Sequence, residues 1–102
     1  MSYQDINVEE FQELMQGEEA VIIDVRTPEE EVEGVIPNAQ LINIMEPSFP
    51  EKIDQLDSDK TYLVFCRSGG RSATACKYMS SKGFTKLYNL QGGIQAWNAK
   101  QG

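Results

Sequence analysis

The run Val21-Ile22-Ile23-Asp24-Val25 constrains the fold most, because its apolar residues are continuous and β-branched. A strand with one face in water alternates apolar and polar side chains, whereas a continuous run is typical of a strand buried on both faces. Such strands belong to parallel sheets covered by helices. Thr61-Tyr62-Leu63-Val64-Phe65 is the clearest strand of the chain and runs directly into Cys66.

Helix signals separate these strand signals. Asn7 and Glu10 match a capping box, as do Ser48 and Glu51. Thr27-Pro28-Glu29-Glu30 combines a cap, a proline at the first helical position and a glutamate at the third. This alternation predicts an α/β fold with a central, mainly parallel sheet of about five strands and helices on both faces. The expected helices follow Asn7, Thr27 and Ser48, cover 72–82 and follow Gly93, and the expected strands cover 21–25, 39–44, 61–65 and 86–90.

Length and charge exclude several classes of protein. A chain of 102 residues fits one domain, which we expect over residues 1–102. Nine basic against sixteen acidic residues give a net charge of −7, which disfavours nucleic acid as a partner. The absence of histidine excludes Cys–His and Ser–His catalytic pairs and zinc sites built on imidazole, and no metal is expected.

Targeting signals and cysteine usage bear on the compartment. No signal peptide is recognisable, and the longest apolar runs span only a few residues, so we expect no membrane partner. Two cysteines are too few for a disulfide scaffold, which favours a reducing compartment with free thiols. We therefore expect a cytoplasmic protein, and a monomer.

The loop Cys66-Arg67-Ser68-Gly69-Gly70-Arg71-Ser72 joins the clearest strand to a helix. A helix N-terminus favours an anion, and Gly69 and Gly70 permit the positive φ with which successive amides turn inward. Arg67 and Arg71 add positive charge to an acidic chain. Each feature stabilises a thiolate, so the loop predicts an activated nucleophile at Cys66 without a general base.

Two other features have a simpler structural interpretation. Cys76 lies inside the expected helix at core-facing spacing, so we expect a buried, unreactive thiol. The acidic run of Glu29, Glu30, Glu31 and Glu33 is expected to complement a helix N-terminus and to face solvent.

The cysteine loop resembles the active loop of the rhodanese family, the sulfurtransferases that carry sulfur as a cysteine persulfide. Three more stretches are similar to that family, and together they extend over nearly the whole chain in the family's order. They are Ile23-Asp24-Val25-Arg26-Thr27-Pro28-Glu29-Glu30, Gly34-Val35-Ile36-Pro37-Asn38-Ala39 and Asn89-Leu90-Gln91-Gly92-Gly93-Ile94-Gln95-Ala96-Trp97. The resemblance is to the single-domain type.

The resemblance implies an enzyme in which Cys66 forms a persulfide. The residues of its loop, Arg67, Ser68, Gly69, Gly70 and Arg71, would hold the transferred sulfur and the anionic donor. The implied donor is thiosulfate or a similar small anion, the acceptor is a thiol, cyanide or a protein cysteine, and no cofactor is required.

The resemblance also suggests roles for residues near the loop. Arg71 would lie near the carboxylate of Asp24. Arg26 would either act at the site or fix the end of its strand through a salt bridge, and Trp97 would pack in the core. Val35 stands where the family commonly has histidine, and Glu31-Val32 where it has an aromatic residue.

Other functions stay open beside sulfur transfer. A cysteine phosphatase has one residue more between cysteine and arginine than the four that separate Cys66 from Arg71. A thiol–disulfide oxidoreductase needs a resolving cysteine near the first one, whereas Cys76 lies ten residues after Cys66, inside the expected helix. A persulfide carrier or interaction module without turnover of its own is a third alternative.

Overall fold

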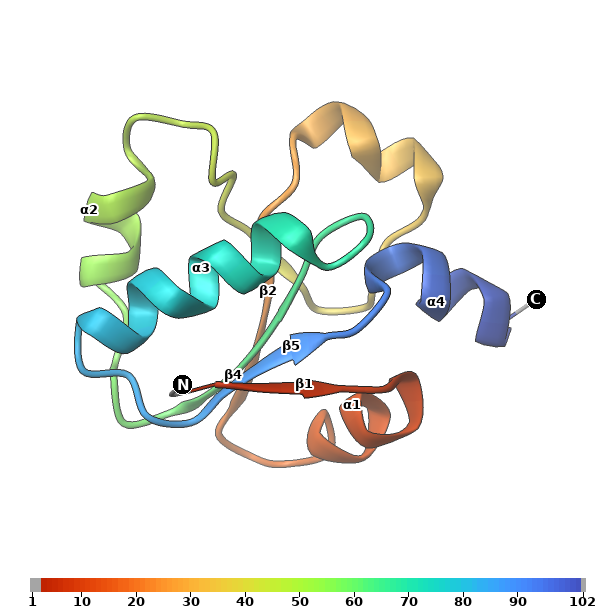
Figure 1. Cartoon of the computed structure of the whole chain (residues 1–102), viewed down its shortest axis with the longest axis horizontal. Helices are drawn as coiled ribbons and strands as arrows, with labels where there is room; N and C mark the ends of the chain where they lie inside the picture. The colour runs from red at the N-terminus through yellow and green to blue at the C-terminus, as the bar shows by residue number, and fades with distance from the viewer. Residues whose placement is uncertain (1–2, 102) are drawn as a thin grey trace.

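The five strands form one parallel sheet at the centre of the molecule (Figure 1) in a computed structural model that describes residues 3–101. Their order across the sheet is β1-β5-β4-β2-β3, and all four neighbouring pairs are parallel. This confirms the predicted fold class. Met1, Ser2 and Gly102, the ends of the expected domain, lie outside the described residues. The strands are β1 (Gln4–Ile6), β2 (Ala20–Asp24), β3 (Gln40–Leu41), β4 (Thr61–Phe65) and β5 (Leu87–Leu90).

Helices cover both faces of this sheet, as the sequence predicted. Helices α2 and α3 contribute to the core on one face, and α1 and α4 contribute to the core on the other (Figure 1). A short 3-10 helix, η1, follows β2. The helices are α1 (Val8–Leu14), η1 (Pro28–Glu33), α2 (Phe49–Asp54), α3 (Gly70–Ser81) and α4 (Gly93–Gln101).

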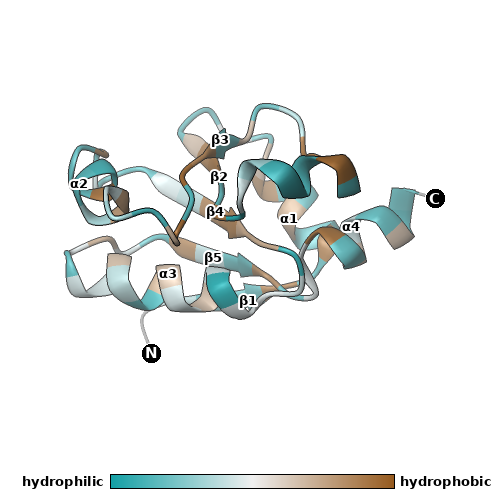
Figure 2. Ribbon diagram, turned by 90° about the horizontal axis from the view of Figure 1, so that it is seen from above, coloured by the Kyte–Doolittle hydropathy of each residue, from teal (hydrophilic) through white to brown (hydrophobic). Residues whose placement is uncertain are grey.

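The continuous apolar runs serve two separate cores. Ile22 packs with the α1 and α4 side, and the next residue, Ile23, packs with the α2 and α3 side. Leu63 and Val64 in β4 divide in the same way. Figure 2 shows brown on β2 and β4, whereas the helices around the sheet are largely teal or pale. Because successive side chains of a strand point to opposite faces, both faces require apolar residues.

Several predicted boundaries were wrong. The segment after Thr27 forms a 3-10 helix, and Ser48 makes no side-chain capping bond. The strand expected over 39–44 is limited to Gln40–Leu41 in β3, although the Ile42 and Ile44 amides still bond to β2 and its extension. Helix α3 begins at Gly70, two residues earlier than expected, so it starts inside the cysteine loop.

Strand β1 was missed by the sequence analysis. It has only three residues, and two of them are exposed. It is a strand because its backbone pairs with β5, where Asp5 lies opposite Asn89. Contacts between opposite ends of the chain carry little local signal, so propensity alone does not reveal them.

Candidate active site

Cys66 follows the carboxyl end of β4, the middle strand of the sheet. The ends of β2 and β5 flank it, because Asp24 pairs with Phe65 and Asn89 pairs with Val64. Sites of α/β sheets form at this edge. Cys66 is only 1 % exposed, so its sulfur lies within the protein rather than on its surface.

The loop from Cys66 to Gly70 closes tightly because α4 supports it. The Ile94 amide donates to the Cys66 carbonyl at 2.9 Å, and the Gln95 amide donates to the Arg67 carbonyl at 3.2 Å. Gly93 makes this approach possible: its φ is +57°, and a Cβ there would overlap the carbonyl oxygens of Cys66 and Arg67. Gly93 thus allows α4 to support the loop directly.

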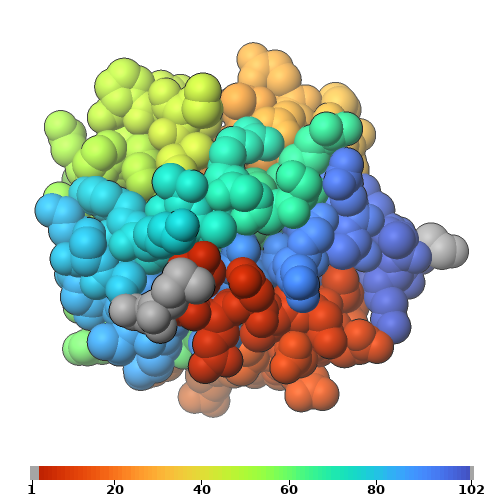
Figure 3. Space-filling view, in the orientation of Figure 1, coloured from red at the N-terminus to blue at the C-terminus, as the bar shows by residue number. Residues whose placement is uncertain are grey.

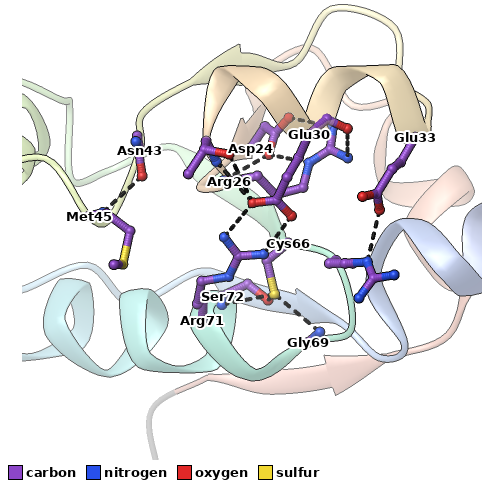
Figure 4. A network of polar contacts seen from close by, with 12 residues as sticks. Asp24, Arg26, Glu30, Glu33, Asn43, Met45, Cys66, Gly69, Arg71 and Ser72 are labelled. Carbon is purple, nitrogen blue, oxygen red and sulfur yellow. Dashed lines mark hydrogen bonds and ion pairs between the residues drawn. The ribbon is translucent and has the colours of Figure 1, made fainter.

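Hydrogen-bond donors surround the Cys66 sulfur (Figure 4). The Gly69 amide lies 3.1 Å from Sγ, the Ser72 amide 3.4 Å and the Ser72 hydroxyl 3.3 Å. Gly69 has φ +107°, the left-handed conformation that turns its amide inward. Of the two glycines that permit a positive φ, only Gly69 adopts it, because Gly70 does not have positive φ.

These donors offset the cost of burying a thiolate. Burial raises the pKa of the Cys66 thiol. Hydrogen bonds from the Ser72 side chain and from the backbone of Ser72, Gly69 and Ser68 lower the pKa, and together they outweigh the effect of burial. The net pKa lies below the ordinary value, which favours the nucleophilic thiolate. In contrast, burial together with Asp5 and Cys66 raises the pKa of Cys76 to about 12. Cys76 is a buried core residue, as predicted.

Each arginine of the loop forms an ion pair with η1. Arg71 contacts both carboxylate oxygens of Glu30, at 2.7 and 2.8 Å, and Arg67 Nε lies 2.8 Å from Glu33. Figure 3 shows η1, in orange, lying against the start of α3, in green. Glu29, Glu31 and Glu33 of the acidic run are exposed, as expected. The sequence analysis did not foresee that Glu30 and Glu33 pair with the loop arginines, or that Glu30 is half-buried.

Asp24 pairs with Arg26. Arg71 was expected to lie near the Asp24 carboxylate, but its hydrogen bonds go to Glu30. Arg26 is fully buried and donates from Nε and Nη2 to the two Asp24 oxygens, both at 2.9 Å. It also donates to the carbonyls of Glu30 and Gly34, at 3.1 and 2.9 Å. Of its two possible roles, the structure shows the salt bridge: Arg26 attaches η1 to the end of β2.

Sequence reasoning missed two polar residues beside the sulfur. Ser72 is fully buried and donates toward Sγ, and Asn89 is 3 % exposed and accepts a hydrogen bond from Ser72. Asn89 does interrupt the apolar strand Leu87–Leu90. A polar side chain in a strand buried on both faces requires a partner, and that signal was available in the sequence.

No cluster of three or more potential metal ligands occurs among residues 3–101. Within the same range, no helix is long and apolar enough to cross a membrane.

Comparison with known proteins identifies the family. Residues 7–100 match the rhodanese-like domain, and the chain belongs to this family. The putative sulfurtransferase YtwF of Bacillus subtilis is 42% identical over 101 residues, which cover 98% of this chain and 95% of YtwF. The thiosulfate sulfurtransferase GlpE of Pseudomonas putida is 32% identical over 97 residues, covering 95% of this chain and 86% of GlpE.

A solved structure shows the same fold. The rhodanese-related protein of Thermoplasma volcanium superimposes with a TM-score of 0.82 at 35% identity, over 96% of this chain and 93% of that protein. The resemblance seen in the four sequence motifs is thereby confirmed at the level of family and fold. These relatives favour a sulfurtransferase of the rhodanese type.

Proposed function

We propose that this protein transfers sulfane sulfur from thiosulfate, or a similar small anionic donor, to a thiol, cyanide or protein cysteine. The observation that supports this most is the set of donors around Cys66 Sγ, from Gly69 and Ser72. They stabilise an anion at the N-terminus of α3 and leave the thiolate as the nucleophile.

The reaction we propose has two displacement steps. The Cys66 thiolate attacks the outer sulfur of thiosulfate, a sulfur–sulfur bond to Cys66 forms, and the bond inside thiosulfate breaks. Its electron pair leaves with sulfite. An acceptor thiolate or cyanide then attacks the outer sulfur of the persulfide, and the electron pair of that bond returns to Cys66 as the thiolate. The steps balance without a metal or an organic cofactor, so we propose none.

The loop residues would act mainly through their backbone. The outer sulfur of the persulfide carries the negative charge, and we propose that the amides at the N-terminus of α3, among them those of Gly69 and Ser72, stabilise it. Arg67 and Arg71 contribute less charge than the sequence suggested, because Glu33 and Glu30 neutralise them. GlpE is a thiosulfate sulfurtransferase by name, which supports thiosulfate as the first donor to test.

The cellular setting follows as part of the same proposal. The two free thiols, Cys66 and Cys76, fit a reducing compartment, and we propose the cytoplasm. We further propose that the chain acts as a single-domain monomer whose partners are the sulfur donor and the acceptor.

Intact-mass measurement tests the intermediate directly. After treatment with thiosulfate the protein is expected to gain the mass of one sulfur atom and to lose it with cyanide. Cys66→Ser must show no gain, whereas Cys76→Ser, the matched control, must show the same gain as the original protein. Release of product from an aryl phosphate, with no persulfide from any of several donors, would instead indicate a phosphatase. Persulfide formation without turnover to any acceptor would indicate a carrier.

A further inference from the structure

The hydroxyl group of Ser72 has two acceptors but only one proton. Its oxygen lies 3.3 Å from Cys66 Sγ and 2.5 Å from Asn89 Oδ1. All three side chains are almost completely buried, at 0–3 % exposure. Water therefore does not compensate whichever acceptor loses the proton.

Asn89 is held so that its oxygen faces Ser72. Its Nδ2 group donates to the Asp5 carboxylate at 2.9 Å and to the Gly69 carbonyl at 3.2 Å. Both N–H bonds of the amide are thus used, and turning the side chain over would break them. Asn89 consequently presents an acceptor to Ser72.

The protonation state of Cys66 decides how well this chain of hydrogen bonds is satisfied. With a thiol, S–H can donate to Ser72 and the Ser72 hydroxyl can donate to Asn89, so every group has a partner. With a thiolate, the Ser72 hydroxyl can donate to the sulfur, and Asn89 then loses its hydrogen bond. Alternatively it donates to Asn89, and the thiolate then has one hydrogen-bond donor fewer. Of these two states, only the thiolate leaves an acceptor without its hydrogen bond from Ser72.

A persulfide removes this conflict. Its negative charge resides on the outer sulfur, which the loop amides can bind, and the inner sulfur bonded to carbon is a weak acceptor. The Ser72 hydroxyl can then donate to Asn89 without leaving a charged group unsatisfied. The hydrogen-bonding groups around Cys66 are therefore better paired in the persulfide state than in the free thiolate state.

We propose that Asn89, held by Asp5, is a positioning residue that competes with the Cys66 thiolate for the Ser72 hydroxyl and so favours the persulfide over the free thiolate. This inference rests on the proposed sulfur transfer. Asn89 does not touch the reacting atoms, and it acts only through Ser72.

Charged and titratable groups around Cys66 stay the same when Asn89 is changed. They are Arg67 in the loop, Arg71 and Cys76 of α3, Glu30 of η1, Asp24 of β2, Arg26 after β2, and Asp5 of β1. A difference in the titration of Cys66 between variants at position 89 therefore reports on the hydrogen bonds.

The test is a double-mutant cycle on the pH dependence of alkylation by iodoacetamide, in a Cys76→Ser background so that one thiol reacts. Asn89→Leu removes the competing acceptor at similar volume. With Ser72 present, the midpoint is expected to fall by about one pH unit, the scale of one hydrogen bond to a charged group. With Ser72→Ala, the same substitution is expected to leave the midpoint unchanged. An equal shift in both backgrounds, or a rise with Ser72 present, overturns the proposal.

Asp5→Ala provides a second variant at an exposed position, should Asn89→Leu not fold. It removes one of the two bonds that hold the Asn89 amide, so a smaller fall is expected. Loss of the Asp5 charge shifts the midpoint in both backgrounds, and the proposal requires an additional fall only where Ser72 is present. The absence of that additional fall counts against it.

A loading measurement separates this inference from the proposed function. At fixed ratios of thiosulfate to sulfite, the persulfide fraction measured by intact mass is expected to correspond to an equilibrium constant about tenfold lower in Asn89→Leu. Normal loading in that variant together with a flat alkylation cycle overturns the role of Asn89 alone. Absence of persulfide in the original protein overturns the sulfur-transfer proposal, while the alkylation cycle still tests Asn89.

Discussion

The guanidinium group of Arg71 binds both carboxylate oxygens of Glu30, which joins the start of α3 to η1 across 41 residues of sequence. The positive charge of Arg71 in the cysteine loop is therefore already neutralised by Glu30. Arg67 and Glu33 repeat the pattern at a more exposed position. The stabilisation of the Cys66 thiolate accordingly depends on hydrogen bonds from Ser72, Gly69 and Ser68.

The two cysteines are expected to differ completely in function. Cys66→Ser should abolish sulfur transfer from thiosulfate, because a hydroxyl group does not supply an anion at neutral pH. Cys76→Ser should retain most activity and lose about 1 kcal/mol of stability, since it places a hydroxyl in a buried apolar site. Steady-state formation of thiocyanate from cyanide measures the first effect, and urea unfolding measures the second. An inactive Cys76→Ser with an active Cys66→Ser would refute the assignment.

The partners of the Arg71–Glu30 pair should change the reactivity of Cys66 in opposite directions. Glu30→Gln leaves Arg71 unpaired, so the pKa of Cys66 is expected to fall and the KM for thiosulfate to decrease. Arg71→Ala leaves the Glu30 carboxylate unpaired, and the pKa is expected to rise by a similar amount. The double variant should lie near the original protein. Alkylation rate against pH gives the midpoints, and unchanged midpoints in both single variants would show that the pair is electrostatically silent at the sulfur.

Glu30 should also make stability depend on pH. The hydrogen bonds from Arg71 lower the pKa of Glu30 from 4.5 to about 2 in the folded protein. A depressed pKa stabilises the fold above the unfolded value of 4.5, and this stabilisation is lost as the pH falls toward about 2. Because the pair is partly exposed, we expect about 1 kcal/mol. Glu30→Gln should thus be less stable than the original protein at pH 7, and the difference should vanish near pH 2. Urea unfolding of both proteins across this range is the measurement; a difference independent of pH would contradict it.

Two glycines near the loop offer a matched pair of substitutions. Gly93→Ala places a Cβ against the carbonyls of Cys66 and Arg67 at a φ of +57°, so a loss of about 2 kcal/mol or more is expected. Gly70→Ala meets no atom within 4 Å, and its φ is not positive, so stability should change by less than about 0.5 kcal/mol. Thermal unfolding compares the two. Equal tolerance at both positions would mean that α4 does not constrain the loop.

Local sequence was sufficient for the features whose parts are close together in the chain. The strand Thr61–Phe65, the cysteine that follows it and the helix N-terminus after it are consecutive, so strand propensity, glycine conformation and helix polarity predicted a thiolate site at Cys66. The buried runs in β2 and β4 likewise predicted a parallel sheet, because a run without alternation requires two covered faces.

Tertiary structure alone decided which groups surround that site. Arg71 pairs with Glu30 rather than Asp24, and Asn89 binds Asp5 from 84 residues away, because sheet order brings β1, β5 and β4 together. The choice among several carboxylates for one arginine depends on distances and burial that residue types do not encode locally. The sequence therefore predicted Cys66 as the nucleophile and determined the kind of sheet that presents it. Packing between distant segments determined its charge balance and its hydrogen-bond network.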